Sequence, residues 1–275
     1  MELKVTRYAV DEGLATITLS RPKRRNAWTG RMHTEYRHLL ARANGDPAVR
    51  VVIVTGDPEG KAFCSGADLG GLEKMTETGE YNPGITGEIE QPGYGVDANF
   101  DATFAYHFGL DKPVIAAMNG AAAGVGLVLA AFCDLRFAVP GAKFTTAHGR
   151  FNMPAEYGLS WLLPRQIGLA RANDLLLSSR VFLAEEALSM GFINAIHPAE
   201  KLMTAVTEYA TLLADGCSPG SLRATRHQVY RDLHGNAAAA VTSSEELLND
   251  MTRHPDYKEG VKAWLEKRKP DWSAG

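Results

Sequence analysis

Cysteine is scarce in this chain of 275 residues, which contains only Cys64, Cys133 and Cys217. Three scattered cysteines fit neither a disulfide framework nor a zinc site with paired ligands. Cys64 also lacks a recognisable general base nearby in the sequence, which argues against a cysteine nucleophile. We therefore expect reduced thiols and no metal site.

The chain also lacks an excess of positive charge and any long apolar run. Lys and Arg total 29 against 32 Asp and Glu, a net charge of -3, so there is no basic field of the kind that nucleic-acid binding relies on. No apolar run is long enough to span a bilayer, and residues 1–8 lack the apolar core of a signal peptide. We expect a cytoplasmic protein without nucleic-acid or membrane partners. A hydrophobic content of 45% in this length suffices for one large core with a pocket.

Strand and helix patterns alternate along the first two thirds of the chain. Hydrophobic periodicity predicts strands at 5–10, 14–19, 51–55, 114–118, 134–139 and 192–196, and helices at 31–43 and 125–132. Residues 70–94 are rich in Gly, Glu and Pro and read as a mobile insert over a site, followed by Phe100, Phe104 and Phe108 at helical spacing.

Helices dominate after Ser160. Their predicted ranges are 161–169, 172–177, 184–190, 201–214, 219–232, 237–251 and 257–267, with Ser218 as an N-cap before Pro219. The sequence therefore predicts an α/β core over 1–198 and a C-terminal helical region over 199–275.

Two short segments each follow a buried strand and precede a helix. They are 61–69, after the strand at 51–55, and 119–126, after the strand at 114–118. Helix N-termini leave N–H donors unsatisfied and carry partial positive charge. Two helix N-termini that lie close together would stabilise an oxygen atom that becomes negative during a reaction. We therefore interpret the two segments as the halves of an oxyanion hole.

These segments and several others resemble the crotonase superfamily, also called the enoyl-CoA hydratase/isomerase family. The resemblance covers nearly the whole chain. It is carried by Arg21-Pro22-Lys23-Arg24-Arg25-Asn26-Ala27, Gly66-Ala67-Asp68-Leu69, Lys112-Pro113-Val114-Ile115-Ala116-Ala117-Met118-Asn119-Gly120, Cys133-Asp134-Leu135-Arg136-Phe137-Ala138, Leu162-Leu163-Pro164-Arg165, Ala184-Glu185-Glu186-Ala187 and the stretch at 259–268. It implies a crotonase-like ββα spiral with a C-terminal helical region, and a homotrimer or dimer of trimers.

The resemblance also implies the ligand. Members bind acyl-coenzyme A as substrate, without a prosthetic group, and hold the thioester carbonyl with two backbone N–H groups that match Ala67 and Val125. Many members have Gly where Val125 stands, but any residue supplies an N–H. The implied coenzyme contacts are Arg24, Ala27, Ala67, Asp68, Leu69, Trp264 and Lys267, where Trp264 and Lys267 are equally well explained as part of an amphipathic terminal helix. We expect the Asp68 side chain itself to cap the helix that presents the Ala67 N–H.

The chain departs from the family's hydratases at their two catalytic glutamates. Val128 and His148 stand at those positions. Hydration needs a water held between two carboxyl groups, and valine provides none. His148 remains a candidate base, hydrogen-bond donor or partner to a carboxylate.

A single carboxylate, Glu156, resembles the acidic residue of the family's isomerases. A double-bond shift needs only one base, which takes a proton beside the conjugated system and returns it at another carbon. Tyr157, Leu159 and Trp161 offer an apolar setting that would raise the pKa of Glu156. Alternatively, the Glu156 carboxylate stabilises the N-terminus of the following helix through the helix dipole and has no catalytic role.

The leading hypothesis is an enoyl-CoA isomerase acting through Glu156. The alternatives are a hydratase or an acyl-CoA hydrolase or lyase using His148, and a non-catalytic acyl-CoA binder. A dinucleotide-binding oxidoreductase is disfavoured, because Leu129 replaces the third glycine of the fingerprint that Gly124 and Gly126 would begin.

Overall fold

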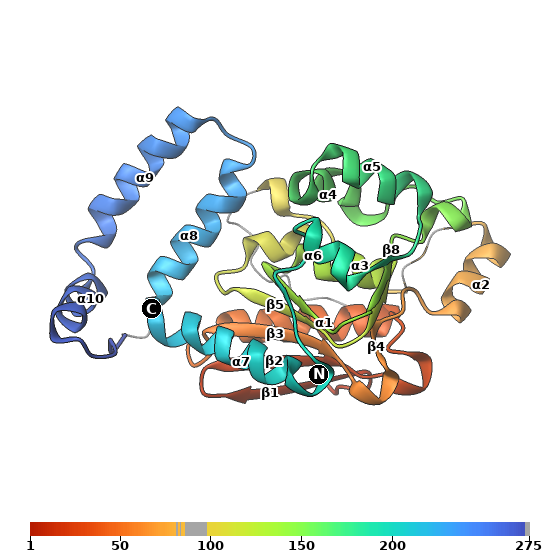
Figure 1. Ribbon diagram of the computed structural model, residues 1–275, viewed down its shortest axis with the longest axis horizontal. Helices are drawn as coiled ribbons and strands as arrows, with labels where there is room; N and C mark the ends of the chain where they lie inside the picture. Colours follow the sequence, from red (N-terminus) through yellow and green to blue (C-terminus); the bar gives the residue numbers. More distant parts are fainter. Residues whose placement is uncertain (81, 83, 86–97, 273–275) are drawn as a thin grey trace.

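Two sheets form the centre of the computed structural model, which describes residues 1–80, 82, 84–85 and 98–272 (Figure 1). The larger has six strands in the order β1-β2-β3-β5-β7-β10, all parallel except the β1–β2 hairpin. The smaller has the order β4-β6-β8-β9. The strands are β1 (Thr6–Asp11), β2 (Leu14–Leu19), β3 (Val51–Gly56), β4 (Ala62–Cys64), β5 (Val114–Met118), β6 (Ala121–Ala123), β7 (Leu135–Ala138), β8 (Lys143–Thr145), β9 (Phe182–Leu183) and β10 (Ala195–Ile196).

The chain alternates between the sheets before it enters a helix. β3 and β4 precede α2, β5 and β6 precede α3, and β7 and β8 precede α4. This repeated strand–strand–helix order confirms the predicted ββα spiral. The helices are α1 (Gly30–Gly45), α2 (Leu69–Thr78), α3 (Val125–Phe132), α4 (Leu159–Ile167), α5 (Leu169–Ser178), α6 (Ala184–Ser189), α7 (Ala199–Gly216), α8 (Pro219–Asp232), α9 (Ala237–Met251) and α10 (Pro255–Glu266).

The C-terminal helices differ in how they contact the core: α7 packs on it, α8 reaches it through Arg226 and Tyr230, and α9 and α10 lie farther out (Figure 1). Leu202, Val206 and Ala210 of α7 are buried in the main hydrophobic core. Helices α8 to α10 extend away from the sheets (Figure 1), and α9 buries none of its residues. The boundary at 198/199 stays a prediction, but α7 packs as part of the core. Ser218 caps α8 by accepting the Ser221 N–H, as expected.

Two local predictions differ from the structure. The first part of the Gly-rich insert forms α2, and its residues 81, 83 and 86–94 lie outside the described residues. The helical spacing of Phe100, Phe104 and Phe108 does not give one helix: two short 3₁₀ helices, η3 (Ala98–Phe100) and η4 (Ala105–Gly109), are separated at Phe104. All three rings are buried in the core. Their regular spacing therefore reflects this shared burial and not one continuous helix.

Candidate active site

The first donor segment connects β4 to α2. The backbone of Trp28 holds it on both sides of Ala67, because the Trp28 N–H donates to the Gly66 carbonyl at 2.8 Å and the Trp28 carbonyl accepts the Asp68 N–H at 2.9 Å. The Asp68 carboxylate accepts the Gly70 N–H at 3.1 Å, which confirms its predicted role as the α2 cap. Within the described residues the Ala67 N–H donates to no protein acceptor.

The second donor segment connects β6 to α3. Gly124 adopts φ 47° and ψ -122°, a conformation that only glycine adopts readily. Its N–H donates to the Thr145 carbonyl, and its own carbonyl accepts the Val128 N–H. Val125 is the first residue of α3, so its N–H is one of the helix's unsatisfied donors, and it has no acceptor in the described part of the chain.

The two donor segments are in direct contact. β4 and β6 pair in parallel, and a Cβ added to Gly66 would lie 3.1 Å from the Ala123 carbonyl oxygen. A Cβ on Gly126 would collide with the Cys64 carbonyl oxygen at 2.3 Å. Glycine at these two positions therefore allows the two segments that carry Ala67 and Val125 to approach each other closely.

Glu156 lies beside the second donor segment. It begins the 3₁₀ turn η6 (Glu156–Gly158), and its Oε2 would lie 3.5 Å from a Cβ built on Gly124. Burial raises the pKa of Glu156, as its apolar neighbours predicted. Among the described residues, the Glu156 carboxylate has no hydrogen-bond partner and no ion-pair partner. A carboxylate with a raised pKa and no partner suits proton transfer.

His148 lies in a separate 3₁₀ turn, η5 (His148–Phe151), and its side chain is buried. Its Nδ1 has no hydrogen-bond partner in the described structure. No hydrogen bond joins His148 to Glu156 among the described residues, so the two form no hydrogen-bonded dyad here. Val128 is fully buried on α3.

Cys64 is no nucleophile. It is fully buried, and burial raises the pKa of its thiol to about 12, which keeps it protonated at neutral pH.

The predicted coenzyme contacts fall into two groups. Arg24, Ala27 and Asp68 gather beside the first donor segment, where Arg21 donates to both the Ala27 carbonyl and the Asp68 carboxylate at 2.8 and 2.9 Å. Leu69, the first residue of α2, is exposed there. Sequence reasoning missed this bridging role of Arg21, although Arg21 opens the motif that contains Arg24 and Ala27.

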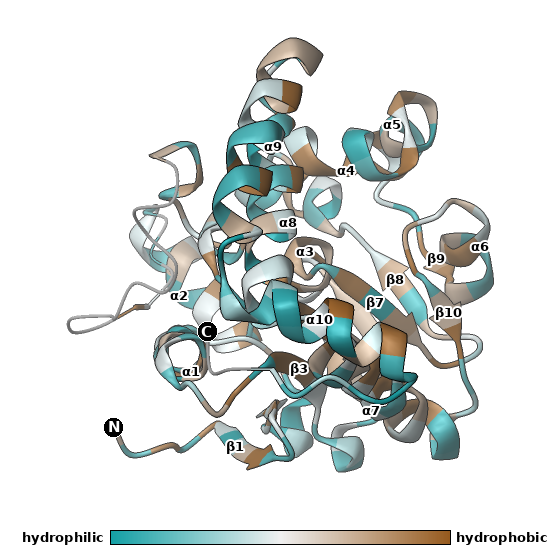
Figure 2. Ribbon diagram, turned by 90° about the vertical axis from the view of Figure 1, so that its left-hand side faces the viewer, coloured by the Kyte–Doolittle hydropathy of each residue, from teal (hydrophilic) through white to brown (hydrophobic). Residues whose placement is uncertain are grey.

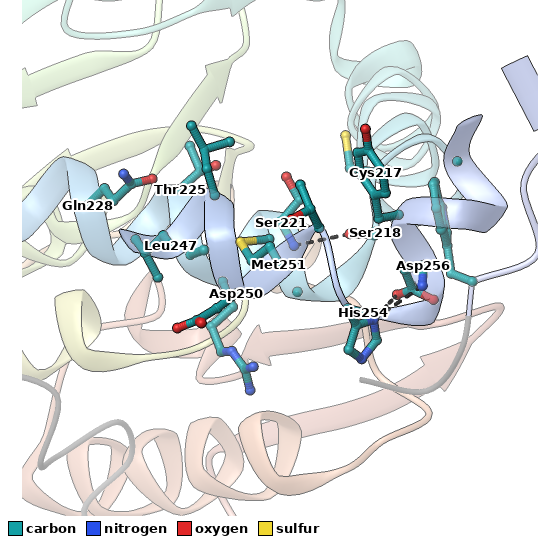
Figure 3. Close-up of a pocket in the computed structure, with 18 of the residues that line it drawn as sticks. Cys217, Ser218, Ser221, Thr225, Gln228, Leu247, Asp250, Met251, His254 and Asp256 are labelled. Carbon is teal, nitrogen blue, oxygen red and sulfur yellow. Dashed lines mark hydrogen bonds and ion pairs between the residues drawn. The ribbon is translucent and has the colours of Figure 1, made fainter. Parts of the chain in front are cut away.

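Trp264 and Lys267 do not join this group. They lie at the end of α10, which Figure 1 shows at the opposite end of the molecule from α2. Trp264 is 84% exposed and lines a cavity of about 1090 Å³ between α8, α9 and α10. Leu247 and Met251 of α9 and Ser221 and Thr225 of α8 line the same cavity (Figure 3).

Comparison with known proteins decides the family. The family model described as Enoyl-CoA hydratase/isomerase matches residues 9–275. The chain belongs to the enoyl-CoA hydratase/isomerase family.

Curated relatives in this family carry different reaction names. A probable enoyl-CoA hydratase of Rhodobacter capsulatus is 34% identical over 99% of both chains. The 1,2-epoxyphenylacetyl-CoA isomerase of Escherichia coli is 32% identical over 96% of both.

Solved structures share the fold. A probable enoyl-CoA hydratase/isomerase from Mycobacterium abscessus has a TM-score of 0.84 at 29% identity, with 98% of each chain covered. An enoyl-CoA hydratase from Bacillus anthracis has a TM-score of 0.86 at 26% identity, covering 99% of this chain and 100% of that one. The protein is thus an enzyme of this family, with acyl-CoA as its substrate class.

Within the described residues, no helix has the length and apolar character to cross a membrane. The same residues contain no cluster of three or more His, Cys, Asp or Glu placed to hold a metal ion.

Proposed function

We propose that this enzyme shifts a double bond of an enoyl-CoA, with Glu156 as the proton shuttle and the N–H groups of Ala67 and Val125 as the oxyanion hole. The observation that carries the proposal is the position of the Glu156 carboxylate, 3.5 Å from where a Cβ on Gly124 would lie, and Gly124 directly precedes the Val125 donor. This position supports the proposal, because within the described residues the Glu156 carboxylate has no hydrogen-bond or ion-pair partner and lies beside the second donor segment.

The reaction follows from this placement. The Glu156 carboxylate takes a proton from C2 of a 3-enoyl-CoA, and the electron pair of that C–H bond moves toward the thioester oxygen. The two N–H groups stabilise the resulting dienolate. Glu156 then returns the proton to C4, which leaves the double bond between C2 and C3. Coenzyme A enters only as part of the substrate, held by Arg24, Ala27, Asp68 and Leu69, and no prosthetic group takes part.

The experiment is an assay of 3-enoyl-CoA conversion by the wild type, Glu156→Gln and Glu73→Gln. Glu73 is an exposed residue of α2 and serves as the matched control. Glu156→Gln is expected to lose at least 10²-fold in kcat because the base is gone, and Glu73→Gln to keep it. Full activity of Glu156→Gln would overturn the proposal.

A second candidate function rests on the unpartnered, buried Nδ1 of His148. A hydratase or acyl-CoA hydrolase using this imidazole predicts that His148→Ala abolishes turnover of a 2-enoyl-CoA or saturated acyl-CoA, while Glu156→Gln has the smaller effect. The hydratase names of several relatives agree with this candidate, whereas the Escherichia coli relative is named for the isomerisation of an epoxyphenylacetyl-CoA. If both variants bind coenzyme A and the wild type turns over neither substrate class, the protein is a binder.

We also propose a homotrimer, or a dimer of trimers, assembled through α8 to α10. The exposed apolar side chains Leu248, Trp264 and Leu265 lie around a cavity that one chain leaves open, and apolar segments of α9 and α10 lie on the surface in Figure 2. A second copy of the chain would cover this face and bring Trp264 and Lys267 to a neighbouring active site.

Light scattering tests the assembly. Leu248→Asp is expected to lower the mass of a wild-type oligomer, while Leu177→Asp on α5, also highly exposed, leaves it unchanged. A monomeric wild type at micromolar concentration would contradict the proposal.

A further inference from the structure

Phe104 holds an unusual backbone conformation immediately before η4. Its φ of 62° and ψ of -34° lie outside the regions that bulky residues adopt. Such a conformation persists only where surrounding contacts determine it, and it clusters at functional sites. The Phe104 ring is fully buried, so it does not itself touch substrate.

The ring of Phe104 packs against both halves of the proposed site. Its centroid lies 5.7 Å from the ring of Trp28, whose backbone brackets Ala67 through two hydrogen bonds. It lies 5.2 Å from the ring of Tyr157, edge to face, and Tyr157 directly follows Glu156. Tyr157 itself has a left-handed φ of 47°. One ring therefore touches a neighbour of the donor and a neighbour of the base.

A buried arginine fixes the other end of η4. Arg226 of α8 donates to the carbonyl oxygens of His107, Phe108 and Leu110, which close the 3₁₀ turn that begins after Phe104. Its guanidinium also pairs with Asp134 at 3.0 Å. Asp134 in turn accepts the Val114 N–H at the start of β5, so η4 is tied to the central sheet.

We propose that Phe104 is a positioning residue that sets the distance between the Ala67 N–H and the Glu156 carboxylate, and that Arg226 holds Phe104 in place. This inference rests on the function proposed above. A displacement of about 1 Å between reacting groups lowers rates by roughly 10²-fold. A change at Phe104 should therefore lower kcat, because misplacement of base and donor acts mainly in the transition state.

The test compares Phe104→Leu with Phe137→Leu. Phe137 is a buried ring of β7 that packs on His197 and Tyr209 and has no ring contact with Trp28 or Tyr157 among the described residues. Both variants lose ring packing, so both should lower the melting temperature. Only Phe104→Leu is expected to lower kcat for a 3-enoyl-CoA, by tenfold or more, with KM and the Kd for coenzyme A within twofold of the wild type. A merely structural role predicts the same kcat for both variants.

Arg226→Lys gives a second route to the same result. Lysine keeps the charge but cannot reach all the acceptors of a guanidinium. It is expected to lower kcat in the same direction, and its effect should not multiply with that of Phe104→Leu in the double variant. If Phe104→Leu does not fold, Arg226→Lys carries the test alone.

The outcomes separate the two proposals. A folded Phe104→Leu with kcat within twofold of the wild type, alongside an inactive Glu156→Gln, overturns the positioning role and leaves the function intact. An active Glu156→Gln, or a wild type without turnover, overturns the proposed function and the positioning role with it.

Discussion

Glu156 lies beside Gly124 in the proposed active site, because a Cβ built on Gly124 would lie at van der Waals distance, 3.5 Å, from Glu156 Oε2. Gly124 also holds a φ of 47° that other residues rarely adopt. The glycine therefore turns the chain into α3 at a point directly beside the carboxylate.

Gly124→Ala should lower both stability and activity. The strained backbone at Gly124 should cost about 1–3 kcal/mol in the free energy of unfolding, and relief of this strain should shift the adjoining Val125 N–H and lower kcat, because the added methyl group itself meets Glu156 Oε2 only at van der Waals distance. The control is Gly141→Ala, where φ is 66° but the added Cβ meets no atom within 4 Å. Urea unfolding should show a loss of stability for both variants, and equal kcat values would refute a role of the Gly124 backbone conformation in activity.

Val125→Pro should remove one oxyanion donor while keeping α3. Proline is tolerated at the first position of a helix and lacks the N–H. The expected loss is about 3 to 4 kcal/mol of transition-state stabilisation, or roughly 10²–10³ in kcat. Val125→Ala keeps the N–H and should keep most activity. Circular dichroism confirms the fold of each variant, and a proline variant with wild-type kcat would exclude this donor.

The raised pKa of Glu156 predicts a pH-dependent cost to stability. The folded state binds the carboxyl proton more tightly than the unfolded state, so this group's contribution favours folding at low pH and is lost as the pH rises through the folded pKa. Glu156→Gln should therefore be stabilised relative to the wild type at pH 8, and the difference should shrink toward pH 4. Melting temperatures across this range measure it, and a difference that grows on acidification would contradict the shift.

His33 predicts the opposite pH dependence. Burial lowers the pKa of His33 to about 4, with the charge of Arg37 as a smaller cause. The unfolded state therefore binds more protons between pH 6.5 and about 4, and stability present above pH 6.5 is lost as the pH falls through this window. His33→Phe should remove about 2 kcal/mol of the loss between pH 7.5 and pH 5. Denaturant titrations at both pH values test this, and an unchanged acid sensitivity would assign the loss to other groups.

The elements predicted most accurately from sequence have strong local signals. Helix α3 spans the predicted residues because an apolar run follows a glycine turn, and α8 matches because the Ser218 cap and the first-turn Pro219 mark its start. The short strands β4 and β6 were missed because each has three residues, whose pairing depends on contacts distant in the chain.

The features of the candidate site also divide into those with a local sequence signal and those that depend on contacts between distant segments. The apolar neighbours of Glu156 predicted the raised pKa, since that effect is local. The contact with Gly124 and the packing of Phe104 between Trp28 and Tyr157 join segments far apart in sequence, so no local pattern revealed them. The helical spacing of three phenylalanines even favoured a continuous helix where Phe104 interrupts it.

Deuterium transfer tests the central claim most directly. A 3-enoyl-CoA with two deuterium atoms on C2 is converted in ordinary water, and the 2-enoyl-CoA from a single turnover is examined at C4. A single carboxylate that carries the proton from C2 to C4 predicts deuterium at C4. Product without deuterium at C4 would contradict a proton shuttle by Glu156.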